Sequence, residues 1–449
     1  MSFVARMTQS HWPRRLLRLA DKSMRTVRRY GWRDFSARAA RKLFPARVHR
    51  RAWSRTYGSE ALLSAERLDF TPEDLARSRA LTDSHRGPID VRSIAWFLPQ
   101  FGHAYYGGVH TILRFAASFT RLHGARHTFV LLGDGTPAEA REYAARIGAA
   151  FPELAEAPVM FAASDDDLGL APSADVAVAT AWDTAYAVLK FNRTRRKCYF
   201  LQDFEPMFFP AGSTSAQAEA TYRFGFYGLT NTITLKRHYQ DDYQGRATHF
   251  DPCVDTGLFY PAAEAAEQPG RPYTVFFYAR PDYRRNGFEL GAVALRKLKQ
   301  QFGDRVRIVS AGQRWRPADY GLAGVVENLG LLAYHETARL YRSCDAGLVM
   351  MFTRHPSYLP FEFMASGCLV VSNVNTATSW LLRDGENCLL ALPSASCIAA
   401  ALARGLEDVA LRRRITAHAA RMVREQFADW DRQAEHVYGY MCDPERDER

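Results

Sequence analysis

Two arginines lie in a turn where a predicted strand gives way to a predicted helix. The apolar run 274–279 reads as a strand that ends at Arg280, and Arg285 comes just before Gly287 and the following helix. Cationic groups in such a turn can neutralise a diphosphate, because arginine forms paired hydrogen bonds to phosphate oxygens. Asn286, in the same turn, is grouped with them as a candidate binding residue. The alternative is that both arginines are ordinary surface charge.

The stretch from Thr353 to Asn375 reads as a loop, a short helix and a buried strand. Pro360 suits the first turn of a helix, where its missing N–H is not needed. Gly367 can end that helix by adopting a positive φ. The apolar, β-branched run 368–371 is typical of a strand covered on both faces. The pattern therefore predicts a helix start between a loop and a strand.

The start of this helix offers groups that could hold a nucleotide. Free N–H groups at a helix start form an anion site, and here they are predicted at Ser357, Tyr358 and Leu359. Glu362 lies in the first turn, where its carboxylate can accept hydrogen bonds from paired hydroxyls such as those of a ribose. The two features together indicate a nucleotide site. The alternative is an ordinary helix–strand unit in which an acidic residue favours the helix dipole.

Two acidic residues follow another predicted strand. The strand 198–201 delivers Asp203 and Glu205 to its carboxyl end. In open α/β sheets, ligands bind outside the carboxyl ends of the strands. These acids are therefore candidates for binding an acceptor or for acid–base chemistry. The alternative is that they cap the loop and stabilise a turn.

Gly107 and Gly108 open a predicted helix between the strands near residues 91–101 and 127–134. Glycines at a helix start let a ligand approach backbone amides closely. The pair does not form the G-x-G-x-x-G pattern of dinucleotide-binding proteins. An NAD-dependent oxidoreductase therefore has no support here, and a tight turn is as good an interpretation of the glycines as a binding site.

Two short acidic strings could suggest a metal. Residues 165–167 and 429–431 both contain D-x-D, whose carboxylates could bind a divalent cation. The first string lies in a predicted polar loop, and the second starts a predicted helix, where acids favour the dipole. The thirteen histidines show no H-E-x-x-H spacing. We therefore assign no metal ligand and expect no metal cofactor.

The order of predicted strands and helices indicates two α/β series. The first series starts near Val91 and includes a predicted strand at 228–235, and the second starts at Tyr273. A strand–helix–strand unit implies a parallel sheet, so we expect two Rossmann-like sheets. The polar, alanine-rich segment 261–272 is the expected linker between them.

The composition is that of a globular protein with more than one domain. The chain has 449 residues, of which 47% are hydrophobic and 24% charged, and ~150 residues is usual for one domain. No segment approaches the roughly 18 apolar residues of a membrane-spanning helix, and the N-terminus lacks the apolar core of a signal peptide. The seven cysteines include no C-x-x-C pair. We therefore expect a cytoplasmic protein with reduced cysteines.

The positive charge is concentrated in residues 1–60. This segment holds 16 Lys and Arg against 3 Asp and Glu, a net charge of +13, so the rest of the chain contributes −2 to the total of +11. Apolar residues alternate with the arginines at near-helical spacing, which is typical of a helix attached to an anionic membrane surface. Nucleic acid would attract the same charge, but the segment has no base-reading motif. A solvated extension without a partner is the other alternative.

With these motifs in place, the chain resembles the retaining GT-B glycosyltransferases of the family 4 type. More narrowly, it is similar to bacterial rhamnosyltransferases of surface-glycan and rhamnan synthesis. The resemblance covers about residues 90–440 and is carried by YYGGVHTILRF, YFLQDFEPMFFPAGS with AEATYRFGF, YARPDYRRNGFELG, HPSYLPFEFMASGCLVVSN and FADWDRQA. It implies an acceptor domain at 61–265, a donor domain at 266–425, and a crossover helix within 426–449 that packs on the N-terminal domain.

The resemblance also implies roles for the candidate residues. The arginines would hold the diphosphate of a nucleotide-sugar donor, Glu362 its ribose, and the glycine pair would face the phosphate and the sugar. Leu331 and Leu332 would lie beside the base. The expected donor-binding residues are Gly107, Gly108, Arg280, Arg285, Asn286, Leu332, Ser357, Tyr358, Leu359 and Glu362, and the expected catalytic residues are Asp203 and Glu205.

Two positions depart from the family pattern. The Glu-x7-Glu motif of the family would place its first acid at position 354, where this chain has Arg354 followed by His355. The histidine that the family carries after a strand of the first domain is also absent, and Gln202 and Asp203 occupy that neighbourhood.

The resemblance predicts the transfer of a deoxyhexose, with rhamnose from dTDP-rhamnose as the first choice. The acceptor would be a growing, lipid-linked surface polysaccharide, and the basic segment 1–60 would hold the enzyme on the inner face of the cell membrane. The alternative is a GT-B-like protein that has lost turnover and acts as a nucleotide-sugar sensor or a partner protein.

Overall fold

The computed structural model describes residues 61–105, 107–262 and 270–445. Residues from Leu68 onward form one compact unit, which contains both sheets. The predicted basic arm, 1–60, lies outside the described residues, as does most of the predicted linker. No helix among the described residues combines the length and the apolar character needed to cross a membrane.

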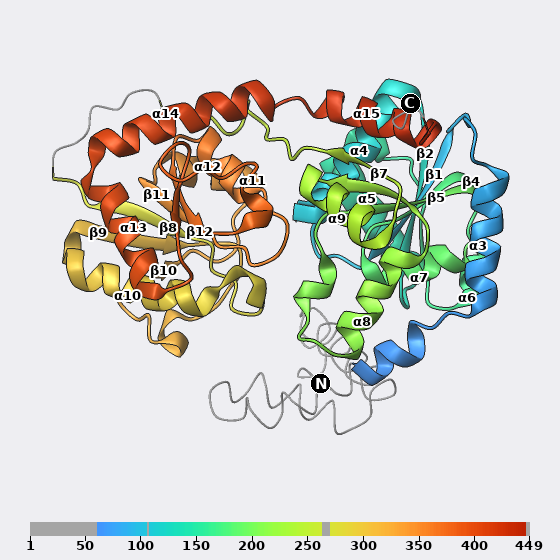
Figure 1. Cartoon of the computed structure of the whole chain (residues 1–449), viewed down its shortest axis with the longest axis horizontal. Coiled ribbons are helices and arrows are strands. Elements are labelled where there is room, and N and C mark those ends of the chain that lie inside the picture. The colour runs from blue at the N-terminus through green and yellow to red at the C-terminus, as the bar shows by residue number, and fades with distance from the viewer. Residues whose placement is uncertain (1–60, 106, 263–269, 446–449) are drawn as a thin grey trace, which may run out of the picture. The chain divides into compact units, whose positions relative to one another are not determined.

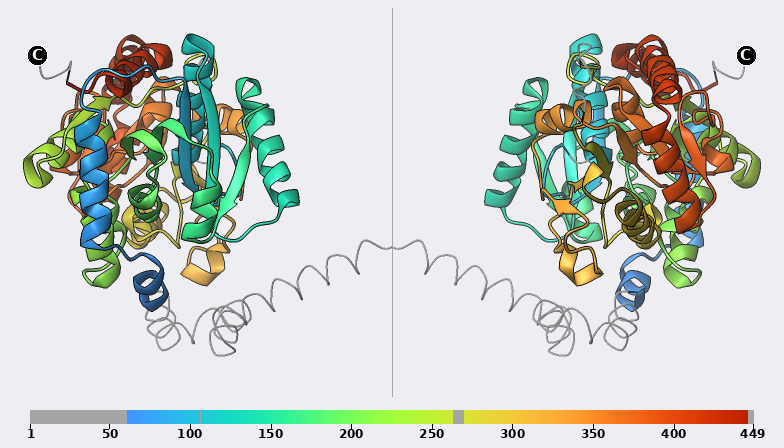
Figure 2. Two further views of the ribbon diagram at one scale, coloured as in Figure 1. Left: turned by 90° about the vertical axis from the view of Figure 1, so that its right-hand side faces the viewer. Right: turned by 90° about the vertical axis from the view of Figure 1, so that its left-hand side faces the viewer.

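The chain forms two parallel sheets, with helices on both faces of each (Figures 1 and 2). This confirms the predicted α/β architecture of two Rossmann-like domains. The first sheet runs in the spatial order β3 (Val159–Ala162), β2 (Arg126–Leu132), β1 (Ser93–Pro99), β4 (Ala174–Ala179), β5 (Thr194–Leu201), β6 (Tyr227–Asn231) and β7 (Ala247–Phe250). The second runs β10 (Glu327–Asn328), β9 (Val306–Ser310), β8 (Tyr273–Phe277), β11 (Ala346–Leu348), β12 (Leu369–Asn373) and β13 (Leu389–Ala391).

The helices follow the strands as the alternating pattern requires. They are α3 (Pro72–Ser84), α4 (Gly107–His123), α5 (Pro137–Ala150), α6 (Asp165–Leu170), α7 (Trp182–Lys190), α8 (Ser213–Ala220), α9 (Ile233–Tyr243), α10 (Phe288–Phe302), α11 (Tyr334–Arg342), α12 (Leu359–Ala365), α13 (Ala395–Glu407), α14 (Val409–Gln426) and α15 (Trp430–Cys442).

Each sheet is buried on both faces because helices cover both sides. Successive side chains of a strand point to opposite sides, so neighbours in a strand pack in different clusters. In β1, Trp96 packs in a hydrophobic cluster with α4 and α15, whereas its neighbour Phe97 packs in a cluster with α7. In β8, Phe277 lies with α10 and α13, and Phe276 lies with α11, α12 and α14. The near-continuous apolar strands of the sequence therefore belong to the centres of the two sheets.

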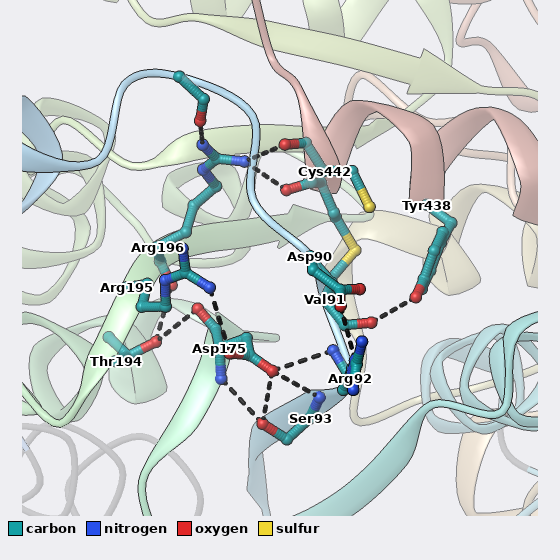
Figure 3. Close-up of polar contacts among 12 residues, drawn as sticks. Asp90, Val91, Arg92, Ser93, Asp175, Thr194, Arg195, Arg196, Tyr438 and Cys442 are labelled. Atoms are coloured by element: carbon teal, nitrogen blue, oxygen red, sulfur yellow. Dashed lines mark hydrogen bonds and ion pairs between the residues drawn. The ribbon is translucent and has the colours of Figure 1, made fainter.

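One buried arginine contributes to holding the last helix, α15, against the first sheet. Arg196, in β5, is 1% exposed. Its guanidinium donates to the carbonyls of Met441 (2.6 Å), Cys442 (2.8 Å), His85 (2.9 Å) and Gly87 (2.7 Å), and Figure 3 shows it directed at the end of α15. A cation at a helix C-terminus is favoured because the carbonyls there carry partial negative charge. The chain thus returns from the second sheet to the first.

Two predicted elements differ from the structure: one strand is shorter than predicted, and one loop is a helix. The run 228–235 was predicted as a strand, but β6 ends at Asn231 and α9 begins at Ile233, because the Thr232 side chain accepts from the N–H of Leu235 and caps the helix. Residues 165–167 were predicted as a loop but start α6, with Ser164 as the capping residue. In both places a hydroxyl next to the run satisfies the helix start.

Candidate active site

Asp203 joins the loop after β5 to the loop before α12. Its Oδ2 accepts from the Thr353 hydroxyl at 2.6 Å, and its Oδ1 accepts from the backbone N–H groups of Arg354 (3.1 Å) and Phe204 (2.8 Å). The residue is 7% exposed. The predicted catalytic acid therefore also links the first sheet to the stretch that carries the predicted nucleotide site.

Burial separates the protonation states of the two predicted catalytic acids. It raises the pKa of Asp203 to about 6, against the lowering effect of its hydrogen bonds and of the Arg285 charge. It raises the pKa of Glu205 to about 8, although that carboxylate accepts the Trp182 N–H at 2.5 Å. At pH 7, Asp203 is therefore mostly ionised and Glu205 mostly protonated. A pair of acids whose pKa values are pushed apart can divide the roles of base and acid.

Arg280 and Arg285 lie against the same aromatic ring. The guanidinium carbon of Arg280 is 3.6 Å from the ring centre of Tyr283, and that of Arg285 is 5.3 Å from it. Arg285 also lies 4.1 Å from the ring centre of Phe208, which follows the acidic loop. Arg280 donates to the Tyr278 hydroxyl at 3.0 Å, while its Nε has no partner among the described residues. Ring stacking leaves most of the guanidinium N–H groups available to a ligand.

Asn286 is buried beneath this turn, at 2% exposure. Its Nδ2 lies 3.1 Å from the sulfur of Met351, and its Oδ1 has no hydrogen-bond partner in the described part of the chain. Two further asparagines fix the adjacent backbone: Asn373 exchanges two hydrogen bonds with Met351, and Asn375 donates to the carbonyls of Met351 and Thr353. The asparagines therefore hold the loop that supplies Thr353 to Asp203.

The loop before α12 differs from the prediction at Ser357. Its N–H donates to Nδ1 of His355 at 3.0 Å and is therefore not free for an anion in this conformation. Ser357 has a φ of 68°, in the left-handed region that non-glycine residues seldom occupy. Burial lowers the pKa of His355 to about 3, so its ring is neutral. Because Nδ1 accepts, the hydrogen is on Nε2, which has no acceptor among the described residues.

Tyr358 also has a structural contact that the sequence did not indicate. α12 begins at Leu359, with Tyr358 as the residue before it. The Tyr358 hydroxyl accepts from Nδ2 of Asn231 at 3.0 Å, and its ring stacks on Trp430 with centres 6.2 Å apart. Since Asn231 ends β6 and Trp430 starts α15, this side chain joins the second sheet to the first.

Glu362 lies in the first turn of α12, as predicted. Burial raises the pKa of its carboxyl to about 8, and no described residue donates a hydrogen bond to that group. A carboxyl of this kind gains donors when paired hydroxyls arrive, which favours its ionised form. Leu332 packs at the edge of the cluster beneath α12, while its neighbour Leu331 is 45% exposed.

The glycine pair lies beside the loop after β5. Nε2 of Gln202 donates to the Gly108 carbonyl at 3.0 Å, and a Cβ at Gly108 would meet the same nitrogen at 3.0 Å. A Cβ at Gly107 would meet open space. Both glycines are exposed at the start of α4. The close approach therefore explains Gly108, and the exposed helix start remains available to a ligand.

The structure brings Arg285 within electrostatic reach of the two predicted catalytic acids. The charge of Arg285 lowers the pKa of both Asp203 and Glu205, so the cation and the acids act on one another. Arg280 is tied to Arg285 through Tyr283 rather than to the acids. An anionic group placed at the arginines would therefore lie within the electrostatic reach of the acidic loop.

Several residues of this region were missed from the sequence. Tyr283 stands between the two arginines and could have been found as an aromatic ring in a basic turn. Tyr334, at the start of α11, lies 5.3 Å from His110 and 6.2 Å from Tyr105, ring centre to ring centre. The role of Thr353 could not be predicted from the sequence, because its hydrogen-bond partner, Asp203, is far away in the chain.

The acidic strings have local roles. Asp167 and Asp429 each accept backbone N–H groups at a helix start, and Asp431 forms an ion pair with Arg121. Within the described ranges, no group of three or more His, Cys, Asp or Glu is arranged to hold a metal ion. The seven cysteines are unpaired, and five of them are buried.

Two family models match the chain in order. The model described as "WsaF, N-terminal domain" matches residues 102–231, and "WsaF, C-terminal domain" matches residues 273–403. The first match contains the glycine pair and the acidic loop, and the second contains the arginine turn and α12.

One curated relative is the O-antigen biosynthesis protein RfbC of Myxococcus xanthus. It is 44% identical over 376 residues, which is 83% of this chain and 29% of that protein. The chain therefore spans less than a third of the length of this relative, and nothing beyond the matched portion is transferred from it.

Solved structures share the fold at low identity. Sucrose-phosphate synthase from Thermosynechococcus elongatus has a TM-score of 0.60 at 16% identity, covering 78% of this chain and 98% of that one. Anabaena HepE, in complex with UDP and glucose, has a TM-score of 0.61 at 17% identity, covering 78% and 99%. Together with the two parallel sheets, these matches establish the architecture. The chain matches the models of the N-terminal and C-terminal WsaF domains in order, and it has the GT-B fold of the glycosyltransferases.

Proposed function

We propose that the protein transfers a sugar from a nucleotide-diphosphate donor to a growing surface polysaccharide. The observation that carries this proposal is that Arg285 lies within electrostatic reach of Asp203 and Glu205. Arginine is suited to binding a diphosphate, and the acids are suited to binding an acceptor hydroxyl. The name of the RfbC relative, an O-antigen biosynthesis protein, supports a surface polysaccharide as the product.

The costly event in such a transfer is departure of the leaving group, because negative charge builds on the diphosphate. Arg280 and Arg285 stabilise that charge, and stabilisation of developing charge is usually the largest catalytic term. Glu362 accepts from the ribose, which holds the donor against α12. In this proposal the transfer is retaining and needs no metal ion.

The acidic loop serves the acceptor. Asp203 is ionised at pH 7 and can accept from an acceptor hydroxyl, while Glu205 can donate its proton. Because Asp203 also holds Thr353, its carboxylate couples acceptor binding to the position of the donor loop. Closure of the two domains on the donor would exclude water and limit its hydrolysis.

We further propose rhamnose, supplied as dTDP-rhamnose, as the sugar and a lipid-linked glycan as the acceptor. Residues 1–60 would hold the enzyme on an anionic membrane surface. Deletion of residues 1–60 is then expected to weaken binding to anionic vesicles while leaving transfer to a soluble acceptor largely intact. Unchanged co-sedimentation of the truncated chain would contradict the membrane role.

A donor panel tests the proposal. The protein is incubated with dTDP-rhamnose, GDP-sugars and UDP-sugars, and binding is followed by thermal shift. A specific donor at a hundred times its Kd should stabilise the fold by about 2.7 kcal/mol. Sugar transfer from that donor to a glycan acceptor completes the test, with and without EDTA. Loss of transfer on chelation would overturn the metal-independent reaction.

A second candidate is a nucleotide-sugar binding protein without turnover. It is favoured by Arg354 at the position of the family acid and by the engagement of both Asp203 and Glu205 with backbone N–H groups. Donor binding without either transfer or slow donor hydrolysis would establish this alternative.

A further inference from the structure

The helix α14 presents an unbalanced positive face. It contains five arginines and one histidine against a single glutamate. Arg414, His418, Arg421 and Arg424 follow one another at spacings of four, three and three, so they share one side of the helix, and all four are exposed. Among the described residues, none of the four forms an ion pair, although Glu425 lies four positions after Arg421 on the same helix.

Such a face carries a cost in the isolated protein. Like charges three or four positions apart on a helix repel each other and destabilise it. Most exposed helices relieve this repulsion by interleaving acids, as Glu219 and Arg223 do on this chain at 2.9 Å. A negatively charged surface laid against α14 would relieve the repulsion in the same way.

A cavity of about 210 Å³ opens beside this face. Its lining combines apolar and charged side chains: Trp380, Leu381, Arg383, His418, Arg421, Met422, Glu425, Gln426 and Phe427. Arg383 is already paired with Glu386 at 3.5 Å. Arg421 and His418 are therefore the lining groups left to meet an anion, beside the carboxylate of Glu425, and both belong to the exposed face as well.

The size of the cavity decides what it can hold. Pockets for drug-sized ligands are roughly 300–1,000 Å³, so this cavity is too small for a nucleotide sugar. A water molecule occupies about 30 Å³ in the liquid, so there is room for a group the size of a phosphate with part of its substituent. None of the lining residues belongs to the candidate active site.

The mixed lining favours an amphiphile over a free anion. Trp380, Met422 and Phe427 offer apolar surface within the same cavity as Arg421, and the indole N–H of Trp380 has no acceptor within the described ranges. A soluble phosphate would use only the cations. A phospholipid would place its phosphate at Arg421 and His418 and its glycerol and upper acyl carbons against the apolar wall.

We propose that the exposed face of α14 and this cavity form a docking site for anionic phospholipid, independent of the nucleotide-sugar site. The arginines contact the negatively charged surface, and one lipid headgroup enters the cavity. The occupant is a bilayer surface, recognised by its charge and its amphiphilic headgroups.

The test compares two charge-matched variants of the full chain. One replaces Arg414, Arg421 and Arg424 by glutamine, and the control replaces the exposed Arg126, Arg296 and Lys297 by glutamine. Partition onto phosphatidylcholine vesicles containing phosphatidylglycerol is measured by co-sedimentation at low lipid concentration and several salt concentrations. Hydrogen exchange of the segment 409–427 is measured with and without vesicles. Thermal unfolding checks that both variants are folded.

Each basic residue near an anionic surface contributes about 1 kcal/mol, so the α14 variant should partition about a hundredfold more weakly, whereas the control changes less than about threefold. Vesicles should protect 409–427 from exchange in the parent protein. Equal losses in both variants, no loss in the α14 variant, or no protection of 409–427 would overturn the proposal. Equal protection by inorganic phosphate or by nucleic acid would overturn the choice of a bilayer.

Discussion

The loop after β5 and the turn after β8 supply opposite charges to the same region, and they are held in different ways. Asp203 and Glu205 are fixed by hydrogen bonds from backbone N–H groups and from Thr353. Arg280 and Arg285 are held chiefly by the faces of aromatic rings. Hydrogen bonds occupy part of the accepting capacity of an acid, whereas ring stacking leaves the N–H groups of an arginine for a ligand. The acidic loop therefore acts as an anchor, and the basic turn is ready to bind.

The same contrast extends to the loop before α12 and to α12 itself. Asp203 and Glu362 are both acids whose pKa is raised by burial, but only Asp203 has hydrogen-bond donors among the described residues. His355 has an N–H without an acceptor, and Asn286 has a carbonyl without a donor. Around the candidate site, the second sheet therefore carries polar groups whose hydrogen-bonding capacity is not met by the described residues.

The largest expected effect comes from removing a cation. Arg285→Ala should lower the rate of sugar transfer by about 10²–10³-fold, because it removes stabilisation of the charge on the leaving diphosphate. Steady-state kinetics with the donor identified by the panel measures the change. Arg285→Lys should recover part of the rate, since it keeps the charge but loses the planar fork.

The control for this experiment is Arg296→Ala, an exposed arginine on α10. It should leave the rate within about twofold, because isolated surface changes have small effects. If Arg280→Ala and Arg285→Ala both leave donor affinity and turnover unchanged, the assignment of the basic turn fails.

The anchor is tested by its contribution to stability. Asp203→Ala leaves the Thr353 hydroxyl and the Arg354 N–H without their acceptor, so the free energy of unfolding should fall by about 2 kcal/mol. Denaturant titration measures this, and Thr353→Val completes a double-mutant cycle. The exposed Asp166→Ala is the control and should change stability by less than about 0.5 kcal/mol. A coupling energy of zero between Asp203 and Thr353 would contradict the anchor.

Glu362 should reveal itself by a proton released on binding. With a pKa of about 8, its carboxyl is mostly protonated at pH 7. Ribose hydroxyls donate to the ionised form and lower this pKa, so nucleotide binding at pH 7 should release up to about 0.9 proton. Calorimetry in buffers of different ionisation enthalpy measures the number. Glu362→Gln should release none, and proton uptake by the parent protein would contradict the ribose contact.

The smallest effect is expected at Ser357. Its φ of 68° costs a non-glycine residue about 1 kcal/mol, so Ser357→Gly should raise the free energy of unfolding by up to that amount. Ser379→Gly is the matched control: its φ is −65°, and glycine there should lower stability. If both changes destabilise the protein, the left-handed conformation is not a source of strain.

The fold was predictable because its signals are local. Short apolar runs between polar loops placed the strands, and β5 and β8 end beside the acids and the arginines as expected. Gly367 adopts a φ of 75° at the end of α12, in agreement with the predicted helix stop. Two helix starts were missed because each depends on a single capping hydroxyl. At Thr232 the surrounding apolar pattern indicated a strand, and at Ser164 the polar composition indicated a loop.

The candidate site was only partly predictable, because its contacts are distant in the sequence. Nothing near Asp203 indicates that it will bond to Thr353, and nothing near Tyr358 indicates Asn231. The prediction of a free N–H at Ser357 was wrong for this conformation because it ignored the side chain of His355, two residues away. Residue type and spacing placed the charges, whereas the hydrogen bonds required the tertiary structure.

The anchoring of α15 by Arg196 has a consequence for how the protein is made. The hydrophobic cluster on one face of the first sheet includes Ala434, Val437 and Met441, all of which lie in α15. During translation, β7 leaves the ribosome long before these residues are added. The part of that face that α15 covers stays exposed while the second domain is synthesised, although α4 already packs on the same face. The first domain therefore completes its core only when the chain has come back to it.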